Sequence, residues 1–172
     1  MNRFGPVGLD DALALQRLME TNAGYTLRIS GREVEPSAAQ EALAALPPHI
    51  SAEQKRGFGL WDEGVLLAFS DVIIGWPEPC TVHIGLLMTD SHRPRQGLGR
   101  ELHQAIVSEL LKIDVLQDLR LAIVNSNVGV AEPLWKSLGY KPTGEAAAYR
   151  SGTVESRSRI WRRALSDQAR PR

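Results

Sequence analysis

Charged and glycine residues gather in the stretch SHRPRQGLGREL, which covers residues 91–102 between an apolar run and an amphipathic pattern. Three arginines crowd this segment: Arg93, Arg95 and Arg100. Gly97 and Gly99 leave the backbone bare where a helix is expected to begin. A helix start exposes unpaired N–H groups and carries partial positive charge, so an anion can bind there without a special cavity. The stretch therefore predicts a phosphate seat, with a basic flexible turn as the alternative.

Two common phosphate-binding motifs do not match this stretch. The dinucleotide fingerprint requires a third glycine three residues after the second one, and position 102 is leucine. The nucleotide P-loop ends in Gly-Lys-Ser/Thr, whereas Gly99 is followed by Arg100 and Glu101. The chemistry of the turn is therefore that of a helix N-terminus with added arginines.

Apolar periodicity predicts the elements that would hold this turn in place. Helices are predicted over Asp10–Asn22, Pro36–Leu46, Leu98–Lys112 and the segment AEPLWKSLGY. Strands are predicted over GFGLWDEG, VLLAFSDVIIGW, Thr81–Thr89 and Leu119–Asn125, followed by a hairpin of GEAAAYRSG and ESRSRIWRRAL. The segment GYTLRISGREVE is expected to be an irregular connection that forms a pocket wall. Together they predict one α/β (α+β) domain over residues 1–172.

Composition excludes several classes of protein. Lys+Arg and Asp+Glu balance at 20 each, so no overall field attracts nucleic acid or anionic lipid. Arginines are dense from residue 150 to residue 172, where we expect a solvated strand and tail rather than a nucleic-acid site. The single cysteine, Cys80, excludes an internal disulfide and suits a reducing compartment. With no leader and no long apolar run, the sequence predicts a cytoplasmic protein that does not bind membranes.

Two blocks of the sequence together resemble the GCN5-related N-acetyltransferase (GNAT) superfamily. The family signature is a central strand, then Gln/Arg-x-x-Gly-x-Gly/Ala, then a helix, and it is matched here by HIGLLMT, PRQGLG and RELHQAIVSELL. A strand, an Asn and a short helix ending in Leu-Gly-Phe/Tyr form the second block, matched by LAIVNSNVGVAEPLWKSLGY. The resemblance covers most of the chain and is strongest from Val65 to Tyr140. It implies a mixed, mostly antiparallel sheet flanked by helices and splayed open between the strands at Leu87 and Ile123.

The resemblance also implies a site for acetyl-CoA. Six consecutive backbone amides would hold the pyrophosphate at the helix start: Arg95, Gln96, Gly97, Leu98, Gly99 and Arg100. The edge of the preceding strand would pair with the pantetheine arm at Leu87, Met88 and Thr89. Asn127 and Trp135, from the second block, would line the far side of that arm.

The sequence departs from the family pattern at two positions. The first signature position, usually Gln or Arg, is Pro94, which has no backbone N–H to donate. Arg93, one residue earlier, is the candidate to supply the missing charge. Many members carry a Tyr on the short helix as general acid for the leaving thiolate, and Trp135 stands there instead. An indole N–H is no useful acid, so water or another residue would have to serve.

Acetyl transfer to an amine requires a neutral nitrogen, and therefore a base or a water path that removes a proton. An amide N–H near Leu87 or Met88 is a candidate donor to the oxyanion. His83 is the leading candidate base: it lies on the central strand, fourteen residues before Gly97, where histone-type members of the family place their catalytic Glu. A neutral imidazole titrates near ~6.5 and can accept a proton at cellular pH. The alternative is a histidine that only packs on the sheet.

Two further residues could meet the acceptor. Asp71 lies inside an apolar strand, where a carboxylate is costly unless it is paired or faces a cleft. It could bind the acceptor amine, act as a base or form a structural ion pair. Tyr25 belongs to the segment that borders the acceptor pocket in this family, and contact with substrate or simple packing both fit it. Cys80 and His92 are expected to be bystanders, and His103 a helix-end or surface residue. No His/Cys/Asp cluster has metal-ligand spacing, so no metal is expected.

These observations predict N-acetyl transfer from acetyl-CoA to a primary amine by direct attack, without an acyl-enzyme. The acceptor is not identified, and a small molecule is preferred. The alternative is an acetyl-CoA-binding regulatory module with weak or lost catalysis, which Pro94 and Trp135 motivate. A homodimer stays open, because exposed final strands often pair in this family.

Overall fold

The computed structural model describes residues 1–166, and its strands form one seven-stranded sheet. The strands are β1 (Arg3–Pro6), β2 (Lys55–Asp62), β3 (Val65–Ile74), β4 (Thr81–Thr89), β5 (Asp118–Val124), β6 (Lys141–Ser151) and β7 (Val154–Ala164). Their order is β1-β2-β3-β4-β5-β7-β6, and only β4 and β5 are parallel. The predicted mixed, mostly antiparallel sheet is confirmed. A single domain over residues 1–172 stays a prediction.

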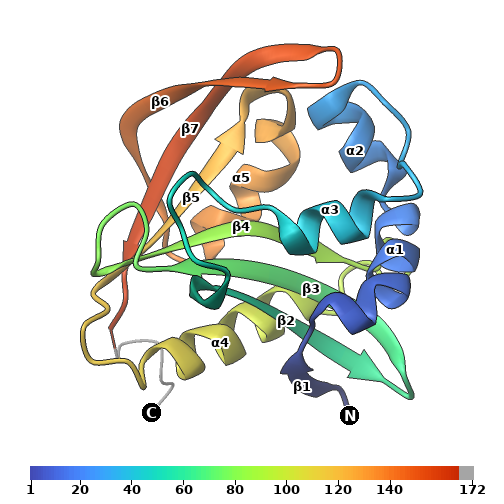
Figure 1. Ribbon diagram of the computed structural model, residues 1–172, viewed down its shortest axis with the longest axis horizontal. Coiled ribbons are helices and arrows are strands. Elements are labelled where there is room, and N and C mark those ends of the chain that lie inside the picture. The colour runs from blue at the N-terminus through green and yellow to red at the C-terminus, as the bar shows by residue number, and fades with distance from the viewer. Residues whose placement is uncertain (167–172) are drawn as a thin grey trace.

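Five α-helices flank the sheet. They are α1 (Ala12–Thr21), α2 (Ala23–Ser30), α3 (Ala38–Ala44), α4 (Leu98–Leu110) and α5 (Val128–Ser137). Figure 1 shows α4 along one face of the sheet and α1 and α3 on the other side. No helix within residues 1–166 has the length and apolar character needed to cross a membrane.

Each face of the sheet has its own apolar core. On one face α4 buries Leu102, Ile106 and Leu110, the stripe predicted from their spacing, and α5 adds Trp135. The other core joins α1 and α3 to β2 and β3, with Leu15, Leu18, Met19, Ala39 and Phe69 among its members. The phosphate-seat turn and the second family block therefore stand over the same core, which fixes their relative position.

The segment after α1 differs from expectation. It forms α2 rather than an irregular connection, although Gly24 and the β-branched Thr26 lower its intrinsic helix propensity. Tertiary contacts compensate, because Arg28 Nε donates to Asn127 Oδ1 at 2.8 Å and the Tyr149 hydroxyl donates to the Ile29 carbonyl at 2.9 Å. The short edge strand β1 was also not predicted, since four residues carry too little periodicity.

The sheet splays open between β4 and β5. Residues Thr81–Ile84 of β4 pair with Asp118–Leu121 of β5, and beyond these residues the two strands diverge. A β-bulge begins the divergence: the partner of Asp71 is Leu86 while the partner of Val72 is Ile84, which leaves Gly85 as the extra residue. Only glycine fits, because a Cβ at position 85 would lie 2.9 Å from Asp71 Oδ1. The splay predicted between the strands at Leu87 and Ile123 is confirmed.

Candidate functional site

A cleft of about 380 Å³ lies at the splay, between the end of β4, the start of α4 and the outer side of α5. It gathers the residues predicted to bind the cofactor: Leu87, Met88, Thr89, Arg95, Gln96, Gly97, Leu98, Gly99, Arg100, Asn127 and Trp135. A narrower hollow of about 80 Å³ continues between the diverging strands. Both spaces share Tyr25, Leu87, Asn127, Ala131 and Trp135. Residues from distant parts of the sequence thus form one continuous channel.

The backbone of Leu87 faces this channel. The Leu86 amide donates to Asp71 Oδ1 at 2.8 Å, and its carbonyl accepts from the Ser70 hydroxyl at 2.6 Å, so both groups point toward β3. Asp90, an even number of residues after Leu86, also directs its amide toward β3 and donates to the Leu67 carbonyl. Because neighbouring residues of a strand point their backbone groups in opposite directions, Leu87 presents its N–H and C=O to the side that β5 has left. An extended ligand can pair with this open edge.

The start of α4 presents further backbone donors. Gly97 is the N-cap residue at φ +73°, and Arg95 also has a positive φ of +61°, which turns the backbone into a concave loop. The Glu101 amide donates to the Gly97 carbonyl at 2.9 Å, as in a regular first turn. Within residues 1–166 the amides of Leu98, Gly99 and Arg100 have no backbone or side-chain acceptor. They remain available to an anion.

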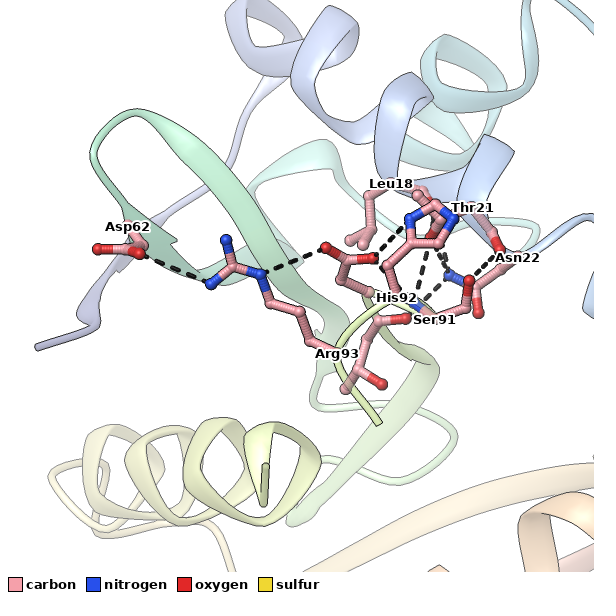
Figure 2. A network of polar contacts seen from close by, with 9 residues as sticks. Leu18, Thr21, Asn22, Asp62, Ser91, His92 and Arg93 are labelled. Atoms are coloured by element: carbon pink, nitrogen blue, oxygen red, sulfur yellow. Dashed lines mark hydrogen bonds and ion pairs between the residues drawn. The ribbon is translucent and has the colours of Figure 1, made fainter. Parts of the chain in front are cut away.

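The loop that carries this turn is tied to the end of α1 (Figure 2). Asn22 Nδ2 donates to the carbonyls of Leu18 and Thr89, at 3.1 and 2.9 Å. The Ser91 hydroxyl donates to the Thr21 carbonyl, and the Ser91 amide donates to the Thr21 hydroxyl at 3.3 Å. These bonds hold the last residue of β4 and the start of the loop against the helix pair α1–α2. The glycine turn predicted to bind phosphate is thereby held beside the channel.

Arg93 does not take over the charge missing at Pro94 as a free cation. Figure 2 shows its guanidinium between two carboxylates, although Arg93 also belongs to the lining of the cleft. Arg93 Nη1 lies 3.7 Å from Asp62 Oδ2, and Arg93 Nε lies 3.7 Å from Asp90 Oδ2. Its charge is compensated and serves to hold the loop against the β2–β3 turn. His92, by contrast, is the exposed bystander that was predicted, with 79% of its side chain exposed.

A cationic residue of the cleft was missed from the sequence. Arg28 of α2 lines the channel, and its Nε–H bond to Asn127 Oδ1 joins α2 to the start of α5 across the opening. The signal is the helical spacing of Tyr25, Arg28 and Ile29, which falls on one face only if the segment is a helix. Treating that segment as irregular removed the signal. Arg100 Nη2 is anchored on the Ser137 hydroxyl of α5 at 3.0 Å.

Trp135 is held by a buried aromatic cluster. Its ring packs edge-on against Tyr140 and His103, with centroids 5.1 and 6.2 Å apart. His103 Nε2 and the Tyr140 hydroxyl form a 2.8 Å hydrogen bond, and His103 is only 1% exposed. The expectation that His103 lies at the surface was therefore wrong. Burial, followed by the charges of Arg163 and Arg100, lowers the pKa of His103 to about 4, so the ring stays neutral.

His83, the predicted general base, lies on β4 but not on the lining of either space. Its Nδ1 is 2.8 Å from Arg120 Nη1, and because an arginine only donates, Nδ1 must be the acceptor. Burial, followed by the charge of Arg120, lowers the pKa of His83 to about 3. A ring with its acceptor occupied and so little basicity does not support the base role.

Asp71, predicted to bind substrate or act as a base, is used inside the sheet. Its Oδ2 lies 3.2 Å from Lys55 Nζ, and its Oδ1 accepts from the Leu86 amide. Lys55 Nζ also donates to the Ala45 carbonyl at 2.7 Å, at the end of α3. Burial raises the pKa of Asp71 while Lys55 acts to lower it. The contacts favour the structural ion pair left open by the sequence.

Tyr25 is the predicted acceptor-side residue that does reach the channel, where it lines both spaces. Burial, then Tyr149 and Asp71, raise the pKa of Tyr25 to about 12. The Tyr25 phenol is therefore a weak acid, and it stays protonated at neutral pH and cannot act as a base. No carboxylate, imidazole, thiol or lysine lines the two spaces in the described part of the chain.

The two buried histidines predict how stability depends on pH. The folded-state pKa values of His83 and His103 both lie below the ordinary value of 6.5. Below pH 6.5 the unfolded chain therefore binds more protons at these two residues than the folded protein does. The contribution of each histidine to the free energy of unfolding is fully present above pH 6.5. It is lost as the pH falls toward the folded-state pKa, about 4 for His103 and about 3 for His83. We expect a loss of about 1.4 kcal/mol per pH unit for each histidine, measured by urea unfolding between pH 6.5 and 5. His103→Gln should reduce the slope, and a flat profile would contradict the assignment.

Other candidate features lie apart from the channel. A hollow of about 600 Å³ between α4, the end of α5 and β7 shares only Arg100 with the cleft. The C-terminal arginines are largely engaged: Arg150 pairs with Glu155, and Arg162 with Glu78 and Asp118. Arg170, Arg172 and Asp167, part of the same arginine-rich segment, lie outside the described residues. Within residues 1–166 no group of three His, Cys, Asp or Glu side chains is arranged to hold a metal.

Comparison with known proteins identifies the architecture. The model of the acetyltransferase (GNAT) family matches residues 17–140. No curated protein matches the sequence. Among solved structures, an acetyltransferase of Thermus thermophilus is 21% identical with a TM-score of 0.71, over 95% of this chain and 97% of its own. The ribosomal-protein-S18-alanine N-acetyltransferase of Escherichia coli is 19% identical with a TM-score of 0.69, over 100% of both chains. The Salmonella typhimurium protein yncA, solved with its cofactor acetyl-CoA, is 16% identical with a TM-score of 0.67, over 99% of this chain and 98% of its own.

Proposed function

The chain belongs to the acetyltransferase (GNAT) family, and we propose that it transfers the acetyl group of acetyl-CoA to a primary amine of a small-molecule acceptor. The observation that carries this proposal is the single channel in which an open strand edge and a bare helix N-terminus meet. A thioester cofactor with a long amide-bearing arm and a pyrophosphate requires both features at once. The acetyl-CoA in the related yncA structure supports the same donor.

The cofactor's parts fit separate portions of the channel. The amides of Leu98, Gly99 and Arg100 would bind the pyrophosphate, with the preceding turn from Arg95 to Gly97 folded around it. The pantetheine arm would donate an amide N–H to the free C=O of Leu87 on β4, which leaves the Leu87 N–H for the thioester end. Asn127 and Trp135 would close the far side. Pro94 removes one donor, but the unbonded amides begin after it and do not depend on it.

The proposed reaction is a direct attack by the amine nitrogen on the thioester carbonyl carbon. The C–N bond forms, the C–S bond breaks, and the thiolate of CoA leaves. The Leu87 N–H is the candidate donor to the carbonyl oxygen as negative charge develops there. Since the described residues of the channel offer no carboxylate or imidazole, the amine proton passes to water and the thiolate is protonated from water. His83 and Asp71 then support the sheet rather than exchange protons.

A regulatory module that binds acetyl-CoA without transferring the acetyl group is the alternative. Trp135 in place of a tyrosine acid is the observation that favours it. Acetyl-CoA titrated by calorimetry, followed by an assay of free thiol with a panel of amines, separates the two. The enzyme is expected to release CoA in an amine-dependent way and to yield the acetylated amine by mass spectrometry. Tight binding with no amine-dependent release from any member of the panel would leave the regulatory module.

A water-mediated proton path has its own consequence for pH dependence. With no titrating group between pH 6 and 8 in the channel, kcat/KM is expected to rise with pH as the acceptor amine loses its proton. The apparent pKa should therefore follow that of the amine when amines of different basicity are compared. A cytoplasmic location and a homodimer stay predictions.

A further inference from the structure

We propose that the acceptor carries a carboxylate in addition to its amine, and that Arg120 binds this carboxylate at the closed end of the splay. The inference rests on the proposed acetyl transfer and specifies the acceptor class of that same site. It follows from a guanidinium on β5 that is held by two side chains, has no ion-pair partner within residues 1–166 and lies beside the place where the strands part.

Two side chains fix the guanidinium of Arg120 in place. Its Nη1 donates to His83 Nδ1 at 2.8 Å, and its Cζ lies 5.2 Å from the centroid of the Trp76 ring. Trp76 and His83 also pack edge to face, with centroids 4.9 Å apart. Cation–π contact and a single neutral acceptor orient an arginine without neutralising its charge. The remaining N–H groups keep the planar fork that matches a carboxylate.

Arg120 forms no direct ion pair in the described part of the chain, whereas the adjacent Arg162 takes both Asp118 and Glu78. Glu78 and Glu145 are near enough to act on Arg120 through their charges, but neither makes an ion pair with it. Burial and the charge of Arg162 lower the pKa of Arg120, while Glu78 and Glu145 act to raise it.

Arg120 faces the acceptor side of the sheet. Leu119 and Leu121 are buried in the core under α4, so by the alternation of a strand Arg120 and Ala122 point to the opposite face. Ala122 is exposed, although β5 is an interior strand of the sheet.

The same alternation places His83 and Gly85 of β4 on that face, and Gly85 is exposed as well. His83 pairs with Arg120 one position before Ile84, the last residue of β4 that pairs with β5. Gly85 and Ala122 line the narrow hollow, and His83 and Arg120 are the next residues on the same face of their strands, two positions toward the paired end of the splay.

The acceptor side of the sheet discriminates by charge. An ammonium finds no carboxylate on the channel lining, because Asp71, the nearest buried acid of β3, is held by Lys55 and the Leu86 amide. A carboxylate finds Arg120, and Arg28 adds a second positive charge at the other end of the channel. Amines that carry an acid group, such as amino acids, are therefore the acceptor class that these charges favour over polyamines or aminoglycosides.

Pairs of acceptors that differ only in the carboxylate test this inference. Phenylalanine is compared with phenethylamine, and 4-aminobutyrate with butylamine, in the free-thiol assay with acetyl-CoA. Charge-assisted hydrogen bonds of this kind correspond to a preference of about 10- to 100-fold in kcat/KM for at least one acid of the set. Arg120→Gln should abolish that preference while leaving the KM for acetyl-CoA unchanged, and Arg120→Lys should keep part of it. Arg56→Gln, at an exposed position on β2, is the matched control and should keep all of it.

Binding measurements separate a wrong acceptor class from a wrong reaction. If CoA is never released, the same four compounds are titrated by calorimetry into the protein saturated with CoA, with Arg120→Gln alongside. Acids that bind only when Arg120 is present would support carboxylate recognition even though transfer had failed. Equal use or equal binding of the acid and its decarboxylated partner, or a preference that survives Arg120→Gln, would overturn the proposal whether or not transfer occurs.

Discussion

Replacing Gly99 with leucine should weaken acetyl-CoA binding by about 100-fold and leave the protein folded. A Cβ at this position would lie 3.5 Å from side-chain atoms of Leu87 and Leu134 and 3.7 Å from Thr89. The first atom of a side chain is thus tolerated, while a larger side chain fills the space between β4 and α5. Leucine is a good helix former, so α4 should not be weakened. Calorimetric titration of acetyl-CoA measures the loss.

Two variants separate blockage of the cleft from general damage to α4. Gly99→Ala adds only the tolerated atom and should show an intermediate loss of affinity. Ser108→Leu adds the same side chain at an exposed position of the same helix and should bind acetyl-CoA like the natural protein. Undiminished binding by a folded Gly99→Leu protein would mean that the cofactor lies elsewhere, and the proposed site would be wrong.

Removing the carboxylate of Asp71 should lower the free energy of unfolding by about 3 kcal/mol. The variant Asp71→Ala leaves Lys55 Nζ without its 3.2 Å partner in a site where both side chains are about nine-tenths buried. It also leaves the Leu86 amide, which now donates at 2.8 Å, without an acceptor at the bulge. Because this bulge starts the divergence of β4 from β5, loss of the carboxylate loosens the channel as well as the core. Urea unfolding at pH 7 gives the change directly.

A double-mutant cycle and an activity assay separate the structural role of Asp71 from a catalytic one. The double variant Lys55→Met/Asp71→Asn should cost less than the sum of the two single changes, because each single change leaves one buried charge unpaired and the double variant leaves none. Asp71→Asn keeps an oxygen for the Leu86 amide and should retain most acetyl transfer. If instead Asp71→Asn folded normally but transferred no acetyl group, the general-base role predicted from the sequence would be restored.

Much of the fold follows from local patterns in this sequence. The bounds of β4 are those predicted, and the buried stripe of α4 falls on Leu102, Ile106 and Leu110, because spacing alone decides which side of an element is apolar. The helix α2 is the counterexample. Its propensity is low and its stability comes from contacts with Asn127 and Tyr149, which are about a hundred residues away and carry no local signal.

The candidate site divides in the same way. Its cofactor side depends on backbone amides at a strand end and a helix start, which a motif can mark regardless of which side chains surround it. Its acid–base residues depend on where individual side chains end, and there the sequence was a poorer guide. His83 and Asp71 are ionisable groups on central strands, yet each is already bonded to a residue of a neighbouring strand. Arg120 donates to His83, and Lys55 forms an ion pair with Asp71.

The sequence by itself determined the family and most of the elements, except α2 and β1, and it predicted the donor side of the site. These properties reside in short contiguous segments, where residue type and spacing fix backbone geometry. Only the tertiary structure decided which charges are already paired and which remain free for a ligand. Strand pairing sets that outcome: the register of β3 and β4 brings Asp71 to Leu86, and the register of β4 and β5 brings Arg120 to His83. The glycine turn at residues 95–100 therefore predicted the donor, whereas the proposal about the acceptor came from side chains that only the folded sheet brings together.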